Sequence, residues 1–273
     1  QVGAVLFLRT SAGWSPDGLM TALAARVLTV PRLRQRLVRL PPGLGRPIWQ
    51  DVAGFRPEDH LATTVCEGGQ QSVLELAADL LVTPLQPDRP LWTARLVTGF
   101  ANDEAALVIV LHHVLADGMA ALAILQQLAS EAVGAPPRPL PAAAPSRVAL
   151  LGDNVRGRLA GLRKIPGRLV RLAAAVAVLG SRSTPAARTS LNRPTGTRRR
   201  LAVVECGLAE ARAAAHAAGA TVNDLALAVI AEGFAALAAT RGERLEHVVV
   251  SVPVSARRAA EAGEQTLEPG RGA

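Results

Sequence analysis

Residues 105–130 read Ala-Ala-Leu-Val-Ile-Val-Leu-His-His-Val-Leu-Ala-Asp-Gly-Met-Ala-Ala-Leu-Ala-Ile-Leu-Gln-Gln-Leu-Ala-Ser, and this stretch decides the fold. Its first seven residues, 105–111, are apolar and rich in β-branched side chains, which predicts a buried strand. From Met119 to Leu128 the apolar residues return at helical spacing, with two glutamines on the wetter side. The sequence therefore predicts a strand followed by a helix, with the polar motif His-His-x-x-x-Asp-Gly at the junction.

The residue types at this junction are suited to chemistry. His112 and His113 follow the predicted strand, and the edges where strands give way to helices collect reactive groups in α/β folds. Neighbouring side chains of a strand point to opposite sides, so we expect the two imidazoles to have different surroundings. Asp117 can cap the helix by accepting a backbone N–H bond, and Gly118 allows another segment to approach closely.

This strand, motif and helix resemble the active-site segment of the coenzyme A-dependent acyltransferase superfamily. That group includes chloramphenicol acetyltransferase-like enzymes, peptide-synthetase condensation domains, polyketide-associated acyltransferases and the bacterial wax ester synthase/diacylglycerol acyltransferases. Further motifs in the expected order make the chain similar to the last of these families over nearly all of 2–258. They are Val-Pro-Arg-Leu-Arg-Gln-Arg-Leu-Val at 30–38, Pro-Leu-x-x-x-Arg-Pro-Leu-Trp at 84–92, Ser-Leu-Asn-Arg-Pro-Thr-Gly at 190–196, Thr-Val-Asn-Asp at 221–224 and Val-Pro-Val-Ser at 252–255.

The resemblance implies an α/β (α+β) fold like that of chloramphenicol acetyltransferase. We expect residues 1–133 to form a complete or nearly complete N-terminal domain that carries the motif, and 134–200 to form a Pro/Ala linker and a basic helical crossover. Residues 201–258 would begin a second, similar domain. The tail, 259–273, does not resemble the family, and its composition predicts disorder. Because the family's Ser-Pro-x-Asp segment and most of its second domain have no counterpart here, we expect a truncated member.

The hydrophobic pattern also predicts the order of the secondary structure. A strand at 93–98 is expected to pair with the strand at 105–111 across a turn at 99–104. The other predicted strands are 2–8, 48–52 and 201–206, and the predicted helices are about 17–29, 70–83, 208–218 and 222–240, with a helical region at 148–180 interrupted by Pro166.

The resemblance implies attack by an alcohol oxygen on a thioester carbonyl. An alcohol is barely ionised at neutral pH, so a base must take its proton as the C–O bond forms. A neutral imidazole, with a pKa near 6.5, can supply about 10²–10⁴-fold of rate in this way. By the resemblance His113 is that base, while His112 faces the core or shapes the site. Asp117 would cap the helix and pair with an arginine, and together with Gly118 it would hold the loop that presents His113.

Two further segments are expected to support the site. The resemblance places Pro90, Leu91 and Trp92 behind the catalytic loop, where packing is the more common role for such residues. It places Asn223 and Asp224 near the domain interface, where they would help to organise the site. The alternative is that Asn223 and Asp224 only cap the helix that follows them.

The remaining histidines and the cysteines indicate no metal site. His60, His216 and His247 match no motif and have no ligand spacing, so we expect surface or core roles for them. Cys66 and Cys206 lie far apart and form no Cys-x-x-Cys pattern. No Gly-rich nucleotide motif or nucleophile-elbow serine occurs. We therefore expect no metal and no bound cofactor, with acyl-CoA as a cosubstrate.

The net charge of +8 is concentrated in one region, because 14 basic residues and a single acid, Asp153, lie between Arg138 and Arg200. A solvated charged helix, contact with an anionic membrane or lipid-droplet surface, and nucleic-acid binding are the three interpretations. The segment has no aromatic residues to stack on bases, which disfavours nucleic acid. Its apolar stretch at 172–180 is too short to span a bilayer. We therefore expect a cytoplasmic protein that associates peripherally with membranes.

These observations lead to one functional hypothesis and two alternatives. The first is an O-acyltransferase that moves a long-chain fatty acyl group from acyl-CoA to diacylglycerol or a long-chain alcohol. One alternative is a condensation-type or polyketide-associated acyltransferase, whose donor is bound to a carrier protein. The other is a truncated, non-catalytic paralogue that binds lipid or membrane.

Overall fold

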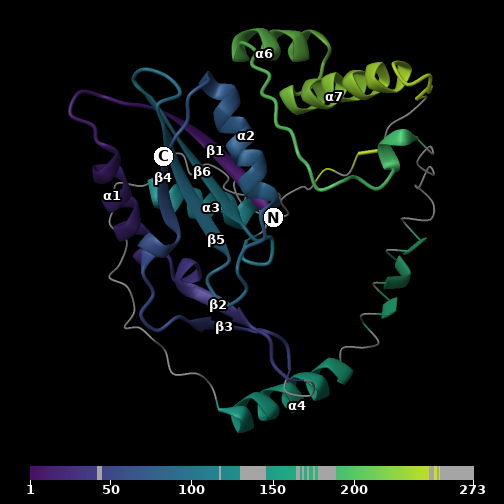
Figure 1. Cartoon of the computed structure of the whole chain (residues 1–273). Helices are drawn as coiled ribbons and strands as arrows, with labels where there is room; N and C mark the ends of the chain where they lie inside the picture. The colour runs from purple at the N-terminus through teal and green to yellow at the C-terminus, as the bar shows by residue number, and fades with distance from the viewer. Residues whose placement is uncertain are drawn as a thin grey trace, which may run out of the picture. The chain divides into compact units, whose positions relative to one another are not determined.

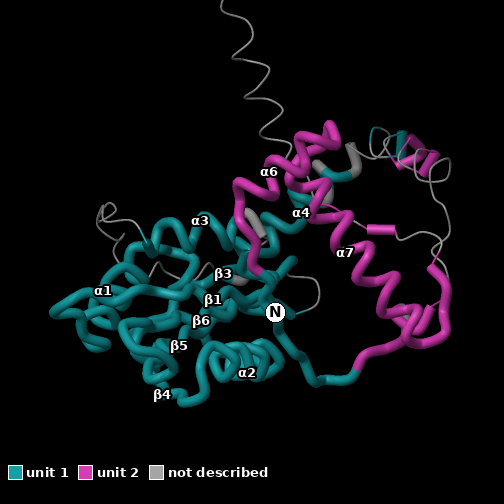
Figure 2. Tube along the Cα trace, turned by 90° about the horizontal axis from the view of Figure 1, so that it is seen from above, with its two compact units in different colours: residues 1–170, 196–204 teal, residues 171–195, 205–273 magenta. Residues whose placement is uncertain are grey.

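The computed structural model describes residues 1–41, 45–116, 118–129, 146–163, 167, 169–170, 172–174, 176–177, 189–245, 249–250 and 252 (Figure 1). The chain divides into two compact units, shown in different colours in Figure 2. The first comprises residues 1–170 and 196–204, and the second comprises residues 171–195 and 205–273. The domain boundaries predicted at 133, 200 and 258 stay a prediction. Residues 134–145, which hold most of the predicted Pro/Ala linker, and the predicted tail at 259–273 lie outside the described residues.

The first unit is built on a four-stranded sheet with the strand order β1-β6-β5-β4 (Figure 1). β1 (Val2–Arg9) and β5 (Trp92–Thr98) flank the central strand β6 (Glu104–Leu111), and both pair with it antiparallel. β4 (Leu61–Val65) pairs with β5 in parallel. These bounds confirm the three strands predicted around 2–8, 93–98 and 105–111, whereas β4 was not predicted.

The turn between β5 and β6 depends on one glycine. Gly99 has a φ of +82°, in the left-handed region that disfavours residues with a Cβ. A Cβ at this position would also lie 2.7 Å from Val65 Cγ1. Glycine here therefore permits both the backbone conformation and the close approach of β4.

The core has two halves because β6 is buried on both faces. Toward α1 (Pro16–Thr29) and α3 (Gly118–Ala129), the strand presents Leu107, Ile109 and Leu111. Toward α2 (Gly69–Val82), it presents Ala106 and Val108. Helices thus cover both faces of the sheet, and the continuous apolar run that predicted a buried strand is explained by this arrangement.

A second, smaller ribbon adjoins this core. The 3-10 helix η1 (Pro31–Arg34) leads into β2 (Gln35–Val38), which pairs antiparallel with β3 (Ile48–Asp51). The strand predicted at 48–52 is confirmed, whereas β2 was not predicted as a strand. Leu33 of η1 is fully buried, and its carbonyl contacts the site described below.

A 3-10 turn, η2 (Pro57–Asp59), precedes β4, and α4 (Arg147–Arg163) covers the first part of the predicted basic helical region. Residues 201–206, predicted as a strand, are irregular in the structure, so that prediction was wrong. The segment has an apolar composition but no partner strand among the described residues, and a strand needs a ladder of hydrogen bonds.

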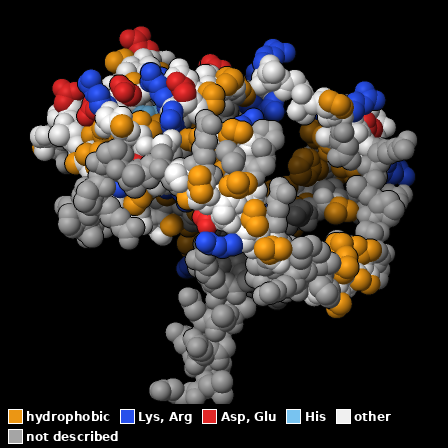
Figure 3. Space-filling view, turned by 90° about the horizontal axis from the view of Figure 1, so that it is seen from below, with side chains coloured by type: hydrophobic (Ala, Val, Ile, Leu, Met, Phe, Trp, Pro, Cys, Tyr) orange, Lys and Arg blue, Asp and Glu red, His pale blue; other side chains and the backbone are white. Residues whose placement is uncertain are grey.

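The second unit contains the short turn η3 (Ser190–Asn192) and the helices α6 (Leu208–Ala217) and α7 (Val222–Ala239), which contact each other. Both helices confirm the predictions at 208–218 and 222–240. By length and composition α7 could cross a membrane, a test that core helices of soluble proteins also pass, and 6% of it is buried. Exposed hydrophobic side chains are not confined to α7, since the face drawn in Figure 3 shows them among charged side chains.

Candidate active site

Strand direction brings three segments to one end of the sheet. β4 and β5 run parallel and both begin at this end, while the antiparallel β6 finishes there, with Leu111 opposite Trp92. His60 immediately precedes β4, and the histidine pair immediately follows β6. The topology therefore places the His-His motif, the Pro-Leu-Trp segment and an additional histidine at a common edge.

The His-His motif lies in a turn and not on the strand. β6 ends at Leu111, and the backbone N–H of Leu115 donates to the carbonyl of His112 over 2.8 Å. The backbone N–H of His112 donates to the carbonyl of Leu91 over 2.9 Å, which ties the turn to the start of β5. The two imidazoles do have different surroundings, since His112 is half-buried and His113 is exposed, but the turn and not strand alternation produces the difference, because the strand ends at Leu111.

The imidazole of His112 is half-buried and used within the turn. Its Nδ1 accepts a hydrogen bond of 3.1 Å from the backbone N–H of Val114. An accepting Nδ1 carries no proton, so a neutral His112 has its proton on Nε2. The His112 ring is thus engaged within the turn, while its supporting role in the site stays a prediction.

His113 is exposed at the top of the same turn. The two residues that close the turn, Leu115 and Ala116, are buried at 6% and 4% exposure and anchor it to the core. The imidazole of His113 is therefore open to the surroundings while its backbone is held on both sides. This arrangement allows His113 to meet a substrate hydroxyl without first breaking core packing. Gly118 is the first residue of α3, and Asp117 lies outside the described residues.

The Pro-Leu-Trp segment lies directly behind the turn. Leu91 and Trp92 are buried, and the carbonyl of Leu91 is the one that accepts from His112. The indole N–H of Trp92 donates to the carbonyl of Leu33 over 2.7 Å. Pro90 is also buried, and its carbonyl accepts from the backbone N–H of Trp92 over 2.9 Å. This segment therefore connects η1 to the backbone of the histidine turn.

His60 is a functional candidate that the sequence analysis missed. Its ring is 8% exposed and stacks on Trp92, with ring centroids 4.7 Å apart and an interplanar angle of 19°. Its Nδ1 lies 2.9 Å from the carbonyl oxygen of Trp92, and because a carbonyl can only accept, Nδ1 carries the proton and donates. Burial lowers the pKa of His60 below its ordinary value, although the bond to Trp92 opposes this and Arg89 adds to it.

No local pattern in the sequence marks His60, because its partner Trp92 is 32 residues away. The one available signal was its position directly before a short run of β-propensity residues, 61–65, that forms β4. Recognising that run as a strand parallel to β5 would have brought His60 to the motif's end of the sheet.

Asn223 and Asp224 lie in the second unit, at the start of α7. Thr221 is the N-cap, and the Asp224 carboxylate accepts from both the backbone N–H and the hydroxyl of Thr221, at 2.9 and 2.7 Å. These two bonds hold the pKa of the Asp224 carboxyl below its ordinary value. The geometry is a capping box, so Asp224 caps α7, while a role for Asn223 and Asp224 in organising the site stays a prediction.

The described residues hold no group of three or more His, Cys, Asp or Glu side chains that could bind a metal ion. The chemistry that they can support is proton transfer by an exposed imidazole held on a fixed turn.

Comparison with known proteins identifies the family of the chain. A family model described as the wax ester synthase/diacylglycerol acyltransferase catalytic domain matches residues 1–226. The probable diacylglycerol O-acyltransferase tgs1 of Mycobacterium tuberculosis is 29% identical over 271 residues, covering 93% of this chain and 58% of that protein. The solved wax ester synthase/diacylglycerol acyltransferase from Marinobacter aquaeolei VT8 is 24% identical with a TM-score of 0.59, covering 87% of this chain and 55% of that one.

The chain thus spans little more than half the length of these two relatives. Within that span, the comparisons confirm the family that the spaced motifs predicted and the chloramphenicol acetyltransferase-like α/β fold. The chain belongs to the wax ester synthase/diacylglycerol acyltransferase family.

Proposed function

We propose that this chain contributes the catalytic base of an O-acyltransferase, which moves a long-chain acyl group from acyl-CoA to diacylglycerol or a long-chain alcohol. The observation that carries the proposal is the exposed imidazole of His113 on a turn anchored by buried residues. The match of residues 1–226 to the catalytic domain of this family supports the same assignment.

In the proposed reaction, His113 accepts the proton of the substrate hydroxyl as its oxygen attacks the thioester carbonyl carbon. The C–S bond then breaks, and the departing thiolate takes the proton back from the imidazolium, which gives free coenzyme A and an ester. Proton transfer of this kind contributes about 10²–10⁴-fold to the rate. Holding the base in place removes part of the entropic cost of bringing the groups together.

The test is acyl transfer by His113→Ala. Purified chain is incubated with palmitoyl-CoA and either dioleoylglycerol or hexadecanol, and the ester product is separated and quantified. We expect His113→Ala to lose about 10²–10⁴-fold in kcat. The matched control is His216→Ala, since His216 is also exposed but lies on α6 in the second unit. Equal transfer by His113→Ala and the parent chain would refute the assignment of the base.

The same assay decides the donor. We expect transfer from palmitoyl-CoA to exceed transfer from a palmitoyl group carried on an acyl carrier protein. The reverse preference would favour a carrier-dependent enzyme of the superfamily. Turnover with neither donor, together with binding to liposomes, would favour a lipid-binding module.

We also propose that the chain associates peripherally with an anionic membrane or lipid-droplet surface, where the lipid substrates reside. Helix α4 supports this, because Val148, Leu151, Val155 and Leu159 recur at spacings of three and four residues and are 48–81% exposed. An aliphatic stripe on a helix within a basic segment is typical of helices that lie in the membrane interface.

Vesicle sedimentation tests the membrane proposal. We expect the chain to sediment with phosphatidylglycerol vesicles more than with phosphatidylcholine vesicles, and Val155→Asp to reduce this severalfold. Ala149→Asp introduces the same charge away from the stripe, so it should have a smaller effect. Equal sedimentation of both variants would contradict a role for the stripe.

A further inference from the structure

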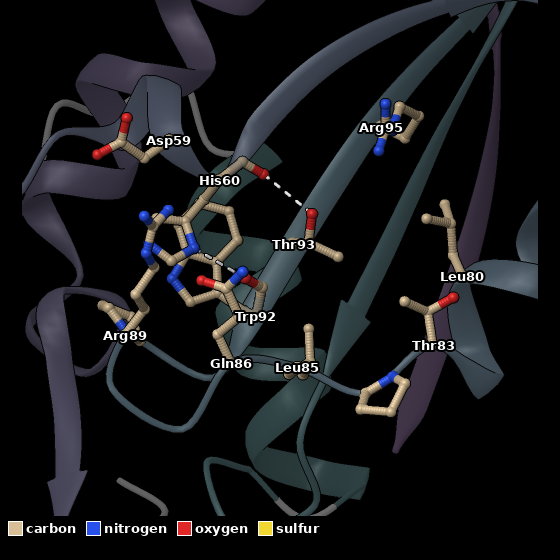
Figure 4. Close-up of a pocket in the computed structure, with 12 residues that line it drawn as sticks. Asp59, His60, Leu80, Thr83, Leu85, Gln86, Arg89, Trp92, Thr93 and Arg95 are labelled. Carbon is tan, nitrogen blue, oxygen red and sulfur yellow. Dashed lines mark hydrogen bonds between the residues drawn. The ribbon is translucent and has the colours of Figure 1, made fainter.

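A pocket of about 210 Å³ opens between the first part of β5 and the end of α2 (Figure 4). Its walls come from η2 and the following histidine, the end of α2, the 83–90 loop and the first part of β5. His112 and His113 are not among its lining residues. The pocket is therefore distinct from the exposed imidazole that the proposed reaction uses.

Positive charge dominates this pocket. Arg89 and Arg95 both line it, whereas the acidic residue of its lining is Asp59, on the exposed rim. Among the described residues neither arginine takes part in an ion pair. Arg95 is half-buried, with a single long hydrogen bond of 3.5 Å from Nη1 to Thr64 Oγ1, and its buried Nε has no partner in the described part of the chain. Two guanidinium groups with unused donors favour an anion.

His60 adds an acceptor to the pocket, not a charge. Its Nδ1–H is used by the carbonyl of Trp92, and its burial favours the neutral ring. Nε2 of that neutral ring is consequently an unprotonated acceptor. Thr93 behaves in the same way, because its hydroxyl donates to the carbonyl of His60 over 3.3 Å and its oxygen can still accept (Figure 4).

The pocket thus combines cations that attract an anion with acceptors that attract hydroxyl groups. Leu80 and Leu85 form an apolar part of its wall, and Figure 4 shows Leu80 across the pocket from His60. Its volume is below the about 300–1,000 Å³ typical of sites for drug-sized ligands, so only a small molecule or headgroup fits. We propose that this pocket binds a phosphate monoester of a small polyol, of about the size of glycerol phosphate.

This ligand chemistry has two possible sources, a free phosphorylated polyol or the headgroup of an anionic phospholipid. Arginine suits both, since its planar group can give two parallel hydrogen bonds to phosphate oxygens. The site does not depend on the proposed acyl transfer, so binding is measured without acyl-CoA.

The test is calorimetric titration of the 273-residue chain with glycerol 3-phosphate, inorganic phosphate and glycerol. We expect glycerol 3-phosphate to bind more tightly than phosphate, and glycerol to give no saturable binding. Arg89→Gln and Arg95→Gln should each weaken glycerol 3-phosphate binding at least tenfold, with a thermal melt to show that the variants are folded. Arg56→Gln is the matched control, because Arg56 is an exposed arginine outside the pocket that pairs with Glu58, and it should bind within twofold of the parent.

Vesicles separate the two sources. Sedimentation with phosphatidic acid vesicles that is lost in Arg89→Gln and kept in Arg56→Gln would support a lipid headgroup. Saturable binding of free glycerol 3-phosphate, with vesicle sedimentation that Arg89→Gln leaves unchanged, would support a soluble ligand. Either result supports the pocket, and His113→Ala should leave both measurements unchanged. Binding of neither ligand form, or equal binding by Arg89→Gln, Arg95→Gln and the parent, would overturn the proposal.

Discussion

Two histidines at the same end of the sheet differ in almost every physical respect. His113 is exposed on a turn that follows β6, whereas His60 is buried before β4 and stacked on Trp92. The sequence motif marks the first and nothing local marks the second. A local motif thus marks an exposed imidazole, whereas a buried imidazole whose partner is distant in sequence becomes visible only through its packing.

The two histidines are joined by a short path through the backbone. His60 donates to the carbonyl of Trp92, and the neighbouring carbonyl of Leu91 accepts from the N–H of His112. His112 in turn accepts from Val114 through its ring. Through these bonds the packing of His60 is connected to the turn that carries His113. Substitutions on the buried and on the exposed side should therefore differ in their effect on stability.

The largest effect on stability is expected at Trp92, on the buried side of the comparison. Trp92→Ala removes a ring that is 3% exposed, and large-to-small changes of this kind cost about 3–5 kcal/mol of unfolding free energy. Trp92→Phe keeps an aromatic ring beside His60 but removes the bond to Leu33, so it should cost less. Urea denaturation measures both. Equal losses in the two variants would show that stacking contributes little.

A smaller effect is expected when the donor of His60 is removed. His60→Phe keeps a ring on Trp92 but has no N–H for its carbonyl, and an unmade buried hydrogen bond costs about 1–3 kcal/mol. His60→Asn supplies an amide N–H near the position of Nδ1 and should recover part of that loss. Hydrogen exchange of peptides that contain His112 reports the consequence for the turn. If exchange is the same in His60→Phe and His60→Asn, the hydrogen bond from His60 to Trp92 does not stabilise the turn.

The dependence of stability on pH gives a further, smaller difference. Burial lowers the pKa of His60 in the folded chain, so the unfolded chain binds a proton more readily as pH falls through about 6.5. The stability from this residue is therefore present above the unfolded pKa and decreases on acidification until the folded pKa is reached. Urea midpoints at about pH 7.5 and 5.5 should show this loss in the parent and less of it in His60→Phe. The same loss in both proteins would assign it to other groups.

The smallest effect on stability is expected at His113, the exposed member of the pair. His113→Ala should change the unfolding free energy by less than about 0.5 kcal/mol, as is usual for surface positions without special contacts. Urea denaturation beside the acyl-transfer assay makes the contrast with Trp92 explicit. A loss comparable to that of Trp92→Ala would mean that His113 serves packing and would weaken its assignment as the base.

Local pattern predicted those parts of the fold in which neighbouring residues decide the outcome. The β5–β6 hairpin, α1, α2, α6 and α7 were found near their observed bounds, because apolar periodicity and turn residues specify them locally. The prediction at 201–206 failed because an apolar composition does not supply a partner strand. β4 was missed for the opposite reason, since its partner is about 30 residues away and only pairing makes it a strand.

By itself the sequence determined the buried central strand and the order of the motifs, and it supplied His113 as the candidate base. The tertiary structure decided that both histidines of the motif lie in a turn, that His60 stacks on Trp92, and that Arg89 and Arg95 line one pocket. The reason is physical. Hydrophobic periodicity is a property of neighbouring residues, whereas the burial of an imidazole and the pairing of a charge depend on segments that meet only when the sheet is assembled.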